Sequence, residues 1–260
     1  MTDTAPASAP LDVLAIGAHP DDAELFAGGT LSAMASAGVN VGIAALTQGE
    51  LGSRGDVTTR RREMQDSTRI LGVASYMLDL PDGGLHDCPE QRLKVAALLR
   101  LTRPRLVMTH APRDRHPDHD AAHALVRAAV FMANLANAPI EGERHRIDRL
   151  VFFLGNHEPA PPAPSIVVAI SPADFSRKLL ALQAYTTQFA GKLPPAPPSE
   201  AAGQPHIATM LPPTFISSPE YWQWIEMRAR YYGRLTGSTL GEPFLLDGPT
   251  PISALHLLAI

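Results

Sequence analysis

Cysteine is almost absent from this chain, which holds one cysteine, Cys88, among 260 residues. A single thiol cannot form an intrachain disulfide, and it excludes a zinc site built from several thiolates. Any metal ion that the chain binds must therefore take imidazole and carboxylate ligands. The 10 histidines and 26 acidic residues can supply them.

Excess charge and long apolar runs are also missing. The formal net charge is −4, which argues against the basic surface that nucleic acids require. No stretch reaches the ~18 apolar residues of a membrane span, and residues 1–10 lack the basic start and apolar core of a signal peptide. We expect a cytoplasmic protein without nucleic-acid or membrane partners, in which residues 1–10 form a disordered or extended tail.

Short apolar runs alternate with helix-forming stretches through the first half of the chain. Buried strands are predicted at residues 11–16, 40–46, 75–80 and 105–109. A helical stretch follows each of them, and Thr58 or Thr59 is expected to cap the second helix. Four such alternations predict an α/β fold with a mostly parallel sheet. The hydrophobic content of 45% is sufficient for one sizeable core.

The second half is less regular. Strands are expected at residues 149–154 and 166–170, and helices at 172–185 and 220–235. Residues 241–244 are expected to be irregular. Residues 190–219 are rich in proline, which predicts a surface loop or lid rather than a second core. We therefore expect residues 11–260 to form a single domain.

A cluster of polar residues, His19–Asp22, lies on the expected turn between the first strand and the first helix. In open α/β sheets, ligands bind outside the carboxyl ends of the strands. A dinucleotide would need a glycine-rich turn there, whereas Asp21 and Asp22 would repel its phosphates. One aspartate that merely caps the helix is the ordinary alternative. The combination of an imidazole with two carboxylates favours a cation site.

A second cluster, His116–His119, follows the fourth strand and is expected at the same edge of the sheet. Catalytic zinc takes three protein ligands and keeps one position for water. His19, Asp22 and His119 together meet that need. The same ligand set also suits ferrous iron, so Zn²⁺ and Fe²⁺ are both candidates.

The other members of the two clusters suit catalytic roles. Asp21 is expected to point away from Asp22 along the turn, as a general base acting on water would require. His116 could stabilise an oxyanion, and Asp118 could hydrogen-bond an imidazole and fix its tautomer.

Two further histidines offer alternatives. His123 follows His119 by four residues, so these two could form a metal pair on one helix face. That pair would leave His116 and Asp118 without a role. His110, at the end of the fourth strand, either supports the site or simply packs in the core.

The paired clusters resemble the LmbE-like (PIG-L) family of zinc-dependent de-N-acetylases. The likeness spans roughly residues 11–250 and includes Gly28–Thr30, Thr47–Gly52, Arg60–Glu63, Leu71-Gly72 and Pro81–Gly83. It implies a Rossmann-like α/β domain with the active site at the carboxyl edge of the strands. It also implies His19, Asp22 and His119 as metal ligands, Asp21 as the base, and His116 paired with Asp118 as the group that stabilises the tetrahedral intermediate.

Residues 170–189 and 225–244 look like the bacillithiol-pathway branch of that family. The resemblance implies a hydrolase acting on an N-acetyl amino sugar, with N-acetylglucosaminyl-malate as the expected substrate, and a homotrimer or homohexamer. It points to Arg60 as a substrate contact, since an arginine fork binds carboxylates well. A solvated basic face over Arg60–Arg62 is the ordinary alternative for that run.

Two other functions stay open. One is a deacetylase for another amide, such as a mycothiol-type glucosaminyl inositol, its thiol conjugates or chitin fragments. The other is a sugar-binding protein without catalysis, in which a metal merely holds the turn. The intact Asp21 argues against the binding protein, because a binding site needs no base there.

Overall fold

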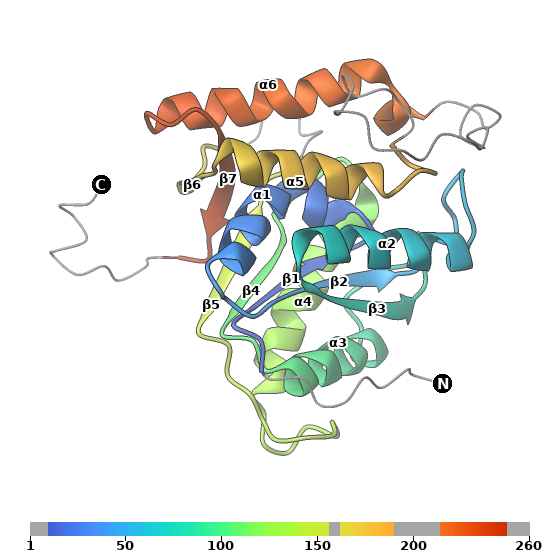
Figure 1. Cartoon of the computed structure of the whole chain (residues 1–260). Coiled ribbons are helices and arrows are strands. Elements are labelled where there is room, and N and C mark those ends of the chain that lie inside the picture. The colour runs from blue at the N-terminus through green and yellow to red at the C-terminus, as the bar shows by residue number, and fades with distance from the viewer. Residues whose placement is uncertain (1–9, 156–161, 190–213, 249–260) are drawn as a thin grey trace, which may run out of the picture.

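The computed structural model describes residues 10–155, 162–189 and 214–248. In these residues seven strands form one sheet in the order β3-β2-β1-β4-β5-β7-β6. Helices cover both faces of the sheet (Figure 1). The predicted α/β fold with a mostly parallel sheet is confirmed.

The first half alternates strands and helices as expected. The elements are β1 (Val13–Gly17), α1 (Asp22–Ser36), β2 (Val41–Thr47), α2 (Val57–Leu71), β3 (Ala74–Leu80), α3 (Pro89–Thr102), β4 (Leu106–His110) and α4 (Pro117–Ala133). Strand β1 pairs in parallel with β2 on one side and with β4 on the other. The chain segments that leave β1 and β4 therefore emerge side by side at the carboxyl edge.

The second half adds β5 (Arg149–Phe153), β6 (Ile166–Ala169), α5 (Pro172–Gln183), the short 3₁₀ helix η2 (Phe215–Ser217), α6 (Pro219–Leu235) and β7 (Gly241–Leu246). Strand β7 runs antiparallel to both β5 and β6. The expectation that residues 241–244 are irregular is therefore wrong. Glycine and proline are uncommon inside strands, so this run does not look like a strand in the sequence. In the structure Pro243 nevertheless pairs opposite Val167 within the sheet.

Parts of the expected tail and loop lie outside the described residues. These are residues 1–9 of the tail and residues 190–213 of the proline-rich stretch. The last six residues of that stretch, 214–219, form η2 and begin α6, and Ser217 is buried there. Within the described ranges no helix has both the length and the apolar character needed to cross a bilayer.

The start of α2 differs from the prediction by a few residues. Asp56 is the N-cap, and its side chain accepts a hydrogen bond of 2.7 Å from the Thr59 amide. Thr58 and Thr59 lie inside the helix instead. An aspartate immediately before a helix is a strong cap, so Asp56 takes the position that the threonines were expected to fill.

A buried carboxylate ties α1 to the distant end of the chain. Glu242 of β7 accepts hydrogen bonds from the amides of Gly29 (3.1 Å) and Thr30 (2.7 Å) and from the Thr30 hydroxyl (2.7 Å). The Lys178 ammonium of α5 donates a fourth, at 2.6 Å. At Gly29 a Cβ atom would come within 2.5 Å of Ile170 Cδ1, so a larger residue there would have to displace this side chain. These contacts fix helix α1, whose first turn carries the polar cluster.

Replacing Glu242 with Gln should destabilise the protein strongly. The side chains of Lys178 and Glu242 are 4% and 1% exposed. The change therefore leaves a buried cation without its counter-charge, which typically lowers the free energy of unfolding by about 3–5 kcal/mol. Urea unfolding followed by circular dichroism measures the loss. Glu226→Gln is the control, because Glu226 and its partner Arg230 are exposed on α6 and such a pair contributes at most ~1 kcal/mol. Equal unfolding midpoints for the two variants would contradict a structural role for the buried pair.

Candidate metal centre

The polar clusters converge where β1, β3 and β4 end. His19–Asp22 follow β1, Asp82 follows β3, and the loop after β4 leads into His116–His119 at the start of α4. His19 Nε2 lies 3.2 Å from Asp118 Oδ2, although the two residues are 99 positions apart. The ring centroids of His19 and His119 are 5.7 Å apart. The structure thus brings the two predicted clusters together.

The turn before α1 places its two aspartates differently. Asp21 occupies the N-cap position with φ of 111°, a conformation rare for residues other than glycine. Its side chain makes no capping hydrogen bond. Asp22 Oδ2 accepts a 2.8 Å hydrogen bond from the His19 amide instead. Helix capping therefore does not account for the carboxylate of Asp21, and strained backbone of this kind is characteristic of functional sites.

Asp22 is surrounded by imidazole nitrogens. Its Oδ1 lies 3.2 Å from His119 Nε2, and its Oδ2 lies 3.5 Å from His19 Nδ1. A third ring, that of His110, places Nε2 3.2 Å from Oδ2. The three predicted metal ligands His19, Asp22 and His119 are therefore neighbours around one buried carboxylate.

His110 does not neutralise this carboxylate. Its Nε2 accepts a 3.0 Å hydrogen bond from the Ala18 amide, so the lone pair of that nitrogen is in use. Burial, together with the nearby charge of His119, lowers the pKa of His110 to about 4. A neutral ring thus packs against Asp22, and the charge of this carboxylate must be balanced by other groups or by an ion.

The rings of His19 and His119 favour their charged forms, because several carboxylates surround them. Burial lowers the pKa of His119, but Asp22 and Asp114 outweigh it and raise the value to about 9. Burial likewise opposes charge on His19, yet hydrogen bonds with Asp118, Asp22 and Asp82 raise its pKa well above the usual range. The cluster therefore attracts positive charge, which a bound cation would supply in place of protons.

Three overlapping groups of donors could each hold an ion. Within each group, one ligand atom per residue lies within 4.8 Å of the others; the groups are His19/His116/His119, Asp22/His110/His119 and His19/Asp82/Asp118. None of the three is the predicted set itself. Each contains His19 or His119, however, and Asp22 contacts both of these rings. His19 and His119 are thus each shared by two of the groups, and Asp22 belongs to one group.

Asp118 contacts a different ring from the one expected. Its carboxylate lies 3.2 Å from His19 Nε2 and accepts a hydrogen bond from the Gly83 amide. Only its backbone amide reaches His116, by donating a 3.2 Å hydrogen bond to Nδ1. The pairing of His116 with the carboxylate of Asp118 is therefore not seen. The His116 ring remains exposed at the mouth of the cluster, 4.8 Å from His119 between centroids.

Arg60 is buried against Asp21. Its Nη2 lies 3.2 Å from Asp21 Oδ2 and donates a short hydrogen bond to the Pro20 carbonyl. Burial raises the pKa of Asp21 to about 7, although the Arg60 guanidinium lowers it. Arg61 and Arg62 are exposed. The solvated basic face therefore describes these two and not Arg60.

Two carboxylates that lie against the cluster, those of Asp82 and Asp114, were not predicted from the sequence. Asp82 Oδ1 lies 3.1 Å from His19 Nε2, and Asp114 Oδ1 lies 3.2 Å from His119 Nδ1. The position of Asp82, just after a predicted strand, was a usable signal. The alternative pair of His119 with His123 gains no support: His123 Nδ1 lies 2.9 Å from the His110 carbonyl, and His123 is in none of the candidate ligand groups of the described residues.

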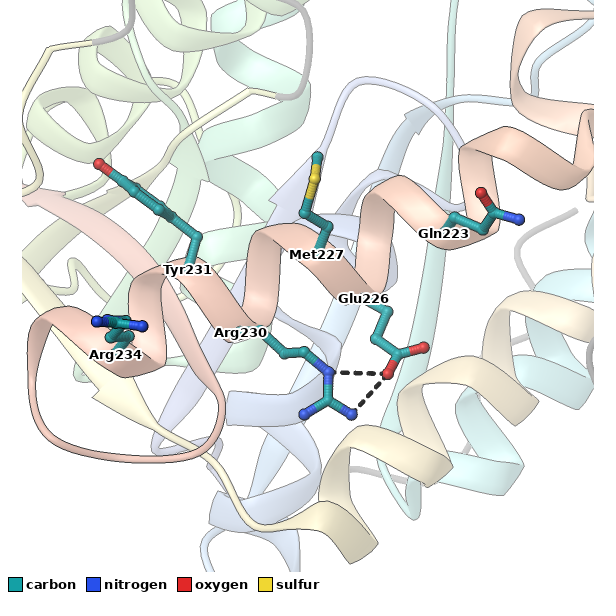
Figure 2. A pocket seen from close by; sticks show the side chains of 6 residues that line it. All are labelled: Gln223, Glu226, Met227, Arg230, Tyr231 and Arg234. Carbon is teal, nitrogen blue, oxygen red and sulfur yellow. Dashed lines mark hydrogen bonds and ion pairs between the residues drawn. The ribbon is translucent and has the colours of Figure 1, made fainter.

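A separate hollow lies on α6. It has a volume of about 460 Å³ and is lined by Gln223, Glu226, Met227, Arg230, Tyr231 and Arg234 (Figure 2). All six side chains come from the outer face of α6, and none belongs to the donor cluster. The hollow offers no converging nucleophile, base or metal ligand. We therefore place the chemistry at the strand ends.

Known proteins share this architecture and much of the sequence. Residues 14–130 match the family described as PIG-L: GlcNAc-PI de-N-acetylase. A diacetylchitobiose deacetylase of Thermococcus kodakarensis is 32% identical over 68% of this chain and 70% of its own length. A probable N-acetyl-alpha-D-glucosaminyl L-malate deacetylase 2 of Bacillus cereus is 29% identical over 68% and 83%. The crystal structure of the conserved protein TT1542 from Thermus thermophilus is 40% identical, covers 94% of this chain and 98% of its own, and superposes with a TM-score of 0.79.

Zinc should stabilise the protein through this cluster. A ligand that binds only the folded state adds about 2.7 kcal/mol when present at 100 times its dissociation constant. Thermal unfolding of metal-stripped protein, with and without added zinc, measures the shift. The shift should vanish in His119→Ala and persist in His123→Ala, since His123 is in none of the candidate ligand groups of the described residues. Identical shifts in the two variants would rule out His119 as a ligand.

Proposed function

The chain belongs to the PIG-L family of de-N-acetylases, and from this premise we propose that it is a metal-dependent hydrolase acting on N-acetylglucosaminyl conjugates. The observation that carries the proposal is the convergence of His19, Asp22 and His119 beside Asp21, whose carboxylate makes no capping hydrogen bond. The donor set is that of a catalytic site for zinc or ferrous iron, with three protein ligands.

A divalent ion held by these three ligands would supply Lewis acidity to the amide carbonyl and to water. The protein contributes the proton transfers. Asp21 accepts the proton of the attacking water and passes it to the leaving amine. Its raised pKa, about 7, suits a group that must both take and give a proton near neutral pH.

His116 and Arg60 complete the proposed site. The exposed ring of His116 stands at the mouth of the cluster, where it can stabilise the oxyanion of the tetrahedral intermediate, a role worth about 3 kcal/mol in comparable sites. Asp118 supports the site through His19. Arg60 holds the Asp21 carboxylate, and its role as a substrate contact stays a prediction.

For the substrate we propose N-acetylglucosaminyl-malate, the compound named for the Bacillus relatives. Other relatives are named for an inositol conjugate and for diacetylchitobiose, so these two compounds are the competing candidates. A homotrimer or homohexamer likewise stays a prediction from the family resemblance, and a cytoplasmic location stays a prediction from the composition.

Replacing Asp21 with Asn should separate catalysis from metal binding. The variant loses the base, which typically lowers turnover about 10²- to 10⁴-fold, while the three metal ligands remain. Acetate release and zinc affinity are measured on the same preparation. Asp66→Asn on the exposed face of α2 is the matched control and should keep full activity. Wild-type turnover in Asp21→Asn would remove this residue from the mechanism.

A substrate panel tests the reaction itself. Acetate release is measured from the malate conjugate, the inositol conjugate and diacetylchitobiose, after zinc or ferrous iron is returned to stripped protein. We expect release from the malate conjugate to be fastest and to stop when a chelator is added. Faster release from another conjugate reassigns the substrate, and binding without acetate release from any of them would favour a sugar-binding protein.

A further inference from the structure

His119 lies between two carboxylates. Its Nε2 is 3.2 Å from Asp22 Oδ1, and its Nδ1 is 3.2 Å from Asp114 Oδ1. All three side chains are buried, that of Asp114 being 3% exposed. Nε2 of the ring thus points to the proposed metal site, while Nδ1 points to the Asp114 carboxylate. This carboxylate has no role in the proposed reaction or in the proposed ligand set.

The Asp114 carboxylate is held firmly in this position. Its Oδ1 accepts a 2.9 Å hydrogen bond from the His116 amide, and its own amide donates a 2.6 Å hydrogen bond to Asp120 Oδ1. The backbone just before it is left-handed, with φ of 68° at Arg113. Gly155, after β5, forms the wall behind the carboxylate, because a Cβ atom there would come within 1.9 Å of Asp114 Oδ2.

A carboxylate behind a histidine decides which ring nitrogen carries the proton. With the Nδ1 proton directed at Asp114, the lone pair of Nε2 points to Asp22 and to an ion bound beside it. The distance of 3.2 Å between His119 Nδ1 and Asp114 Oδ1 is within hydrogen-bond range. The contact does not meet the angle of a hydrogen bond, so Nδ1 has no hydrogen-bond partner among the described residues.

The same arrangement occurs at the other ligand ring. His19 Nδ1 faces Asp22, and His19 Nε2 lies near Asp82 and Asp118. Each proposed ligand histidine therefore has one nitrogen toward Asp22 and the other toward a second carboxylate. This regularity argues that Asp114 belongs to the site rather than to the loop alone.

We infer that Asp114 is a positioning residue that orients His119 toward the metal ion, with Gly155 leaving the space for its carboxylate. The inference rests on the proposed function, because it takes the ion to be held by His19, Asp22 and His119. Partners of this kind typically contribute 10- to 100-fold to metal affinity.

Zinc affinity, measured by competition with a chromophoric chelator, tests the inference directly. Asp114→Ala should bind zinc about 10- to 100-fold more weakly than the wild type. Asp114→Asn should lose less, because its amide oxygen can still accept the hydrogen bond from His116. Asp114→Asn also keeps the test decisive if the alanine variant does not fold.

Gly155→Ala gives an independent test that leaves every polar side chain in place. Its methyl group must displace the Asp114 carboxylate, so zinc affinity should fall as in Asp114→Ala. Gly38→Ala is the control: it strains a backbone with φ of +82° but meets no atom within 4 Å, and it lies beyond the far end of α1. It should bind zinc as the wild type does.

Wild-type zinc affinity in Asp114→Asn and Gly155→Ala would overturn the inference, even if both variants were less stable. A wild-type protein that binds no zinc would overturn it as well. Failure of the proposed function has a different signature, namely a wild-type protein that binds zinc through His119 and releases no acetate from any N-acetyl sugar conjugate.

Discussion

One buried carboxylate, that of Asp22, sets the requirements for the rest of the site. A buried charge is costly unless neighbouring groups or an ion compensate it. Here the rings of His19 and His119 face its two oxygens, while His110 offers only an occupied lone pair. The arrangement is self-consistent when a divalent cation lies among these groups. Asp21, which is turned away from the cap and held by Arg60, then stands ready for proton transfer.

The fold brings these groups together by strand order. Because β1 and β4 are parallel neighbours, the loops that follow them open onto the same edge, and residues 99 positions apart come within 3.2 Å. The position of α1 depends in turn on Glu242 and Lys178, which lie far along the chain and are buried against its middle. The irregular second half thus helps to position a site whose proposed ligands all come from the first half.

Much of this could be predicted, and the failures have physical reasons. The alternation of strands and helices, with polar clusters after the first and fourth strands, predicts the sheet and the meeting of His19 with His119. Strand β7 was missed because Gly241 and Pro243 interrupt its apolar pattern. The partner of the Asp118 carboxylate and the position of Asp114 depend on rotamers and on a left-handed residue at 113, which no spacing in the sequence encodes. The burial of Arg60 beside its exposed neighbours Arg61 and Arg62 likewise depends on contacts with the distant turn at Pro20 and Asp21.

The central claim is that a single divalent ion binds where His19, Asp22 and His119 meet. Anomalous diffraction at the zinc edge, from crystals of the stripped protein given one equivalent of zinc, tests it most directly. We predict one strong anomalous peak bonded to those three side chains at about 2.0–2.2 Å. A peak among His19, Asp82 and Asp118 without contact to Asp22 and His119, or no peak in the cluster, would contradict it.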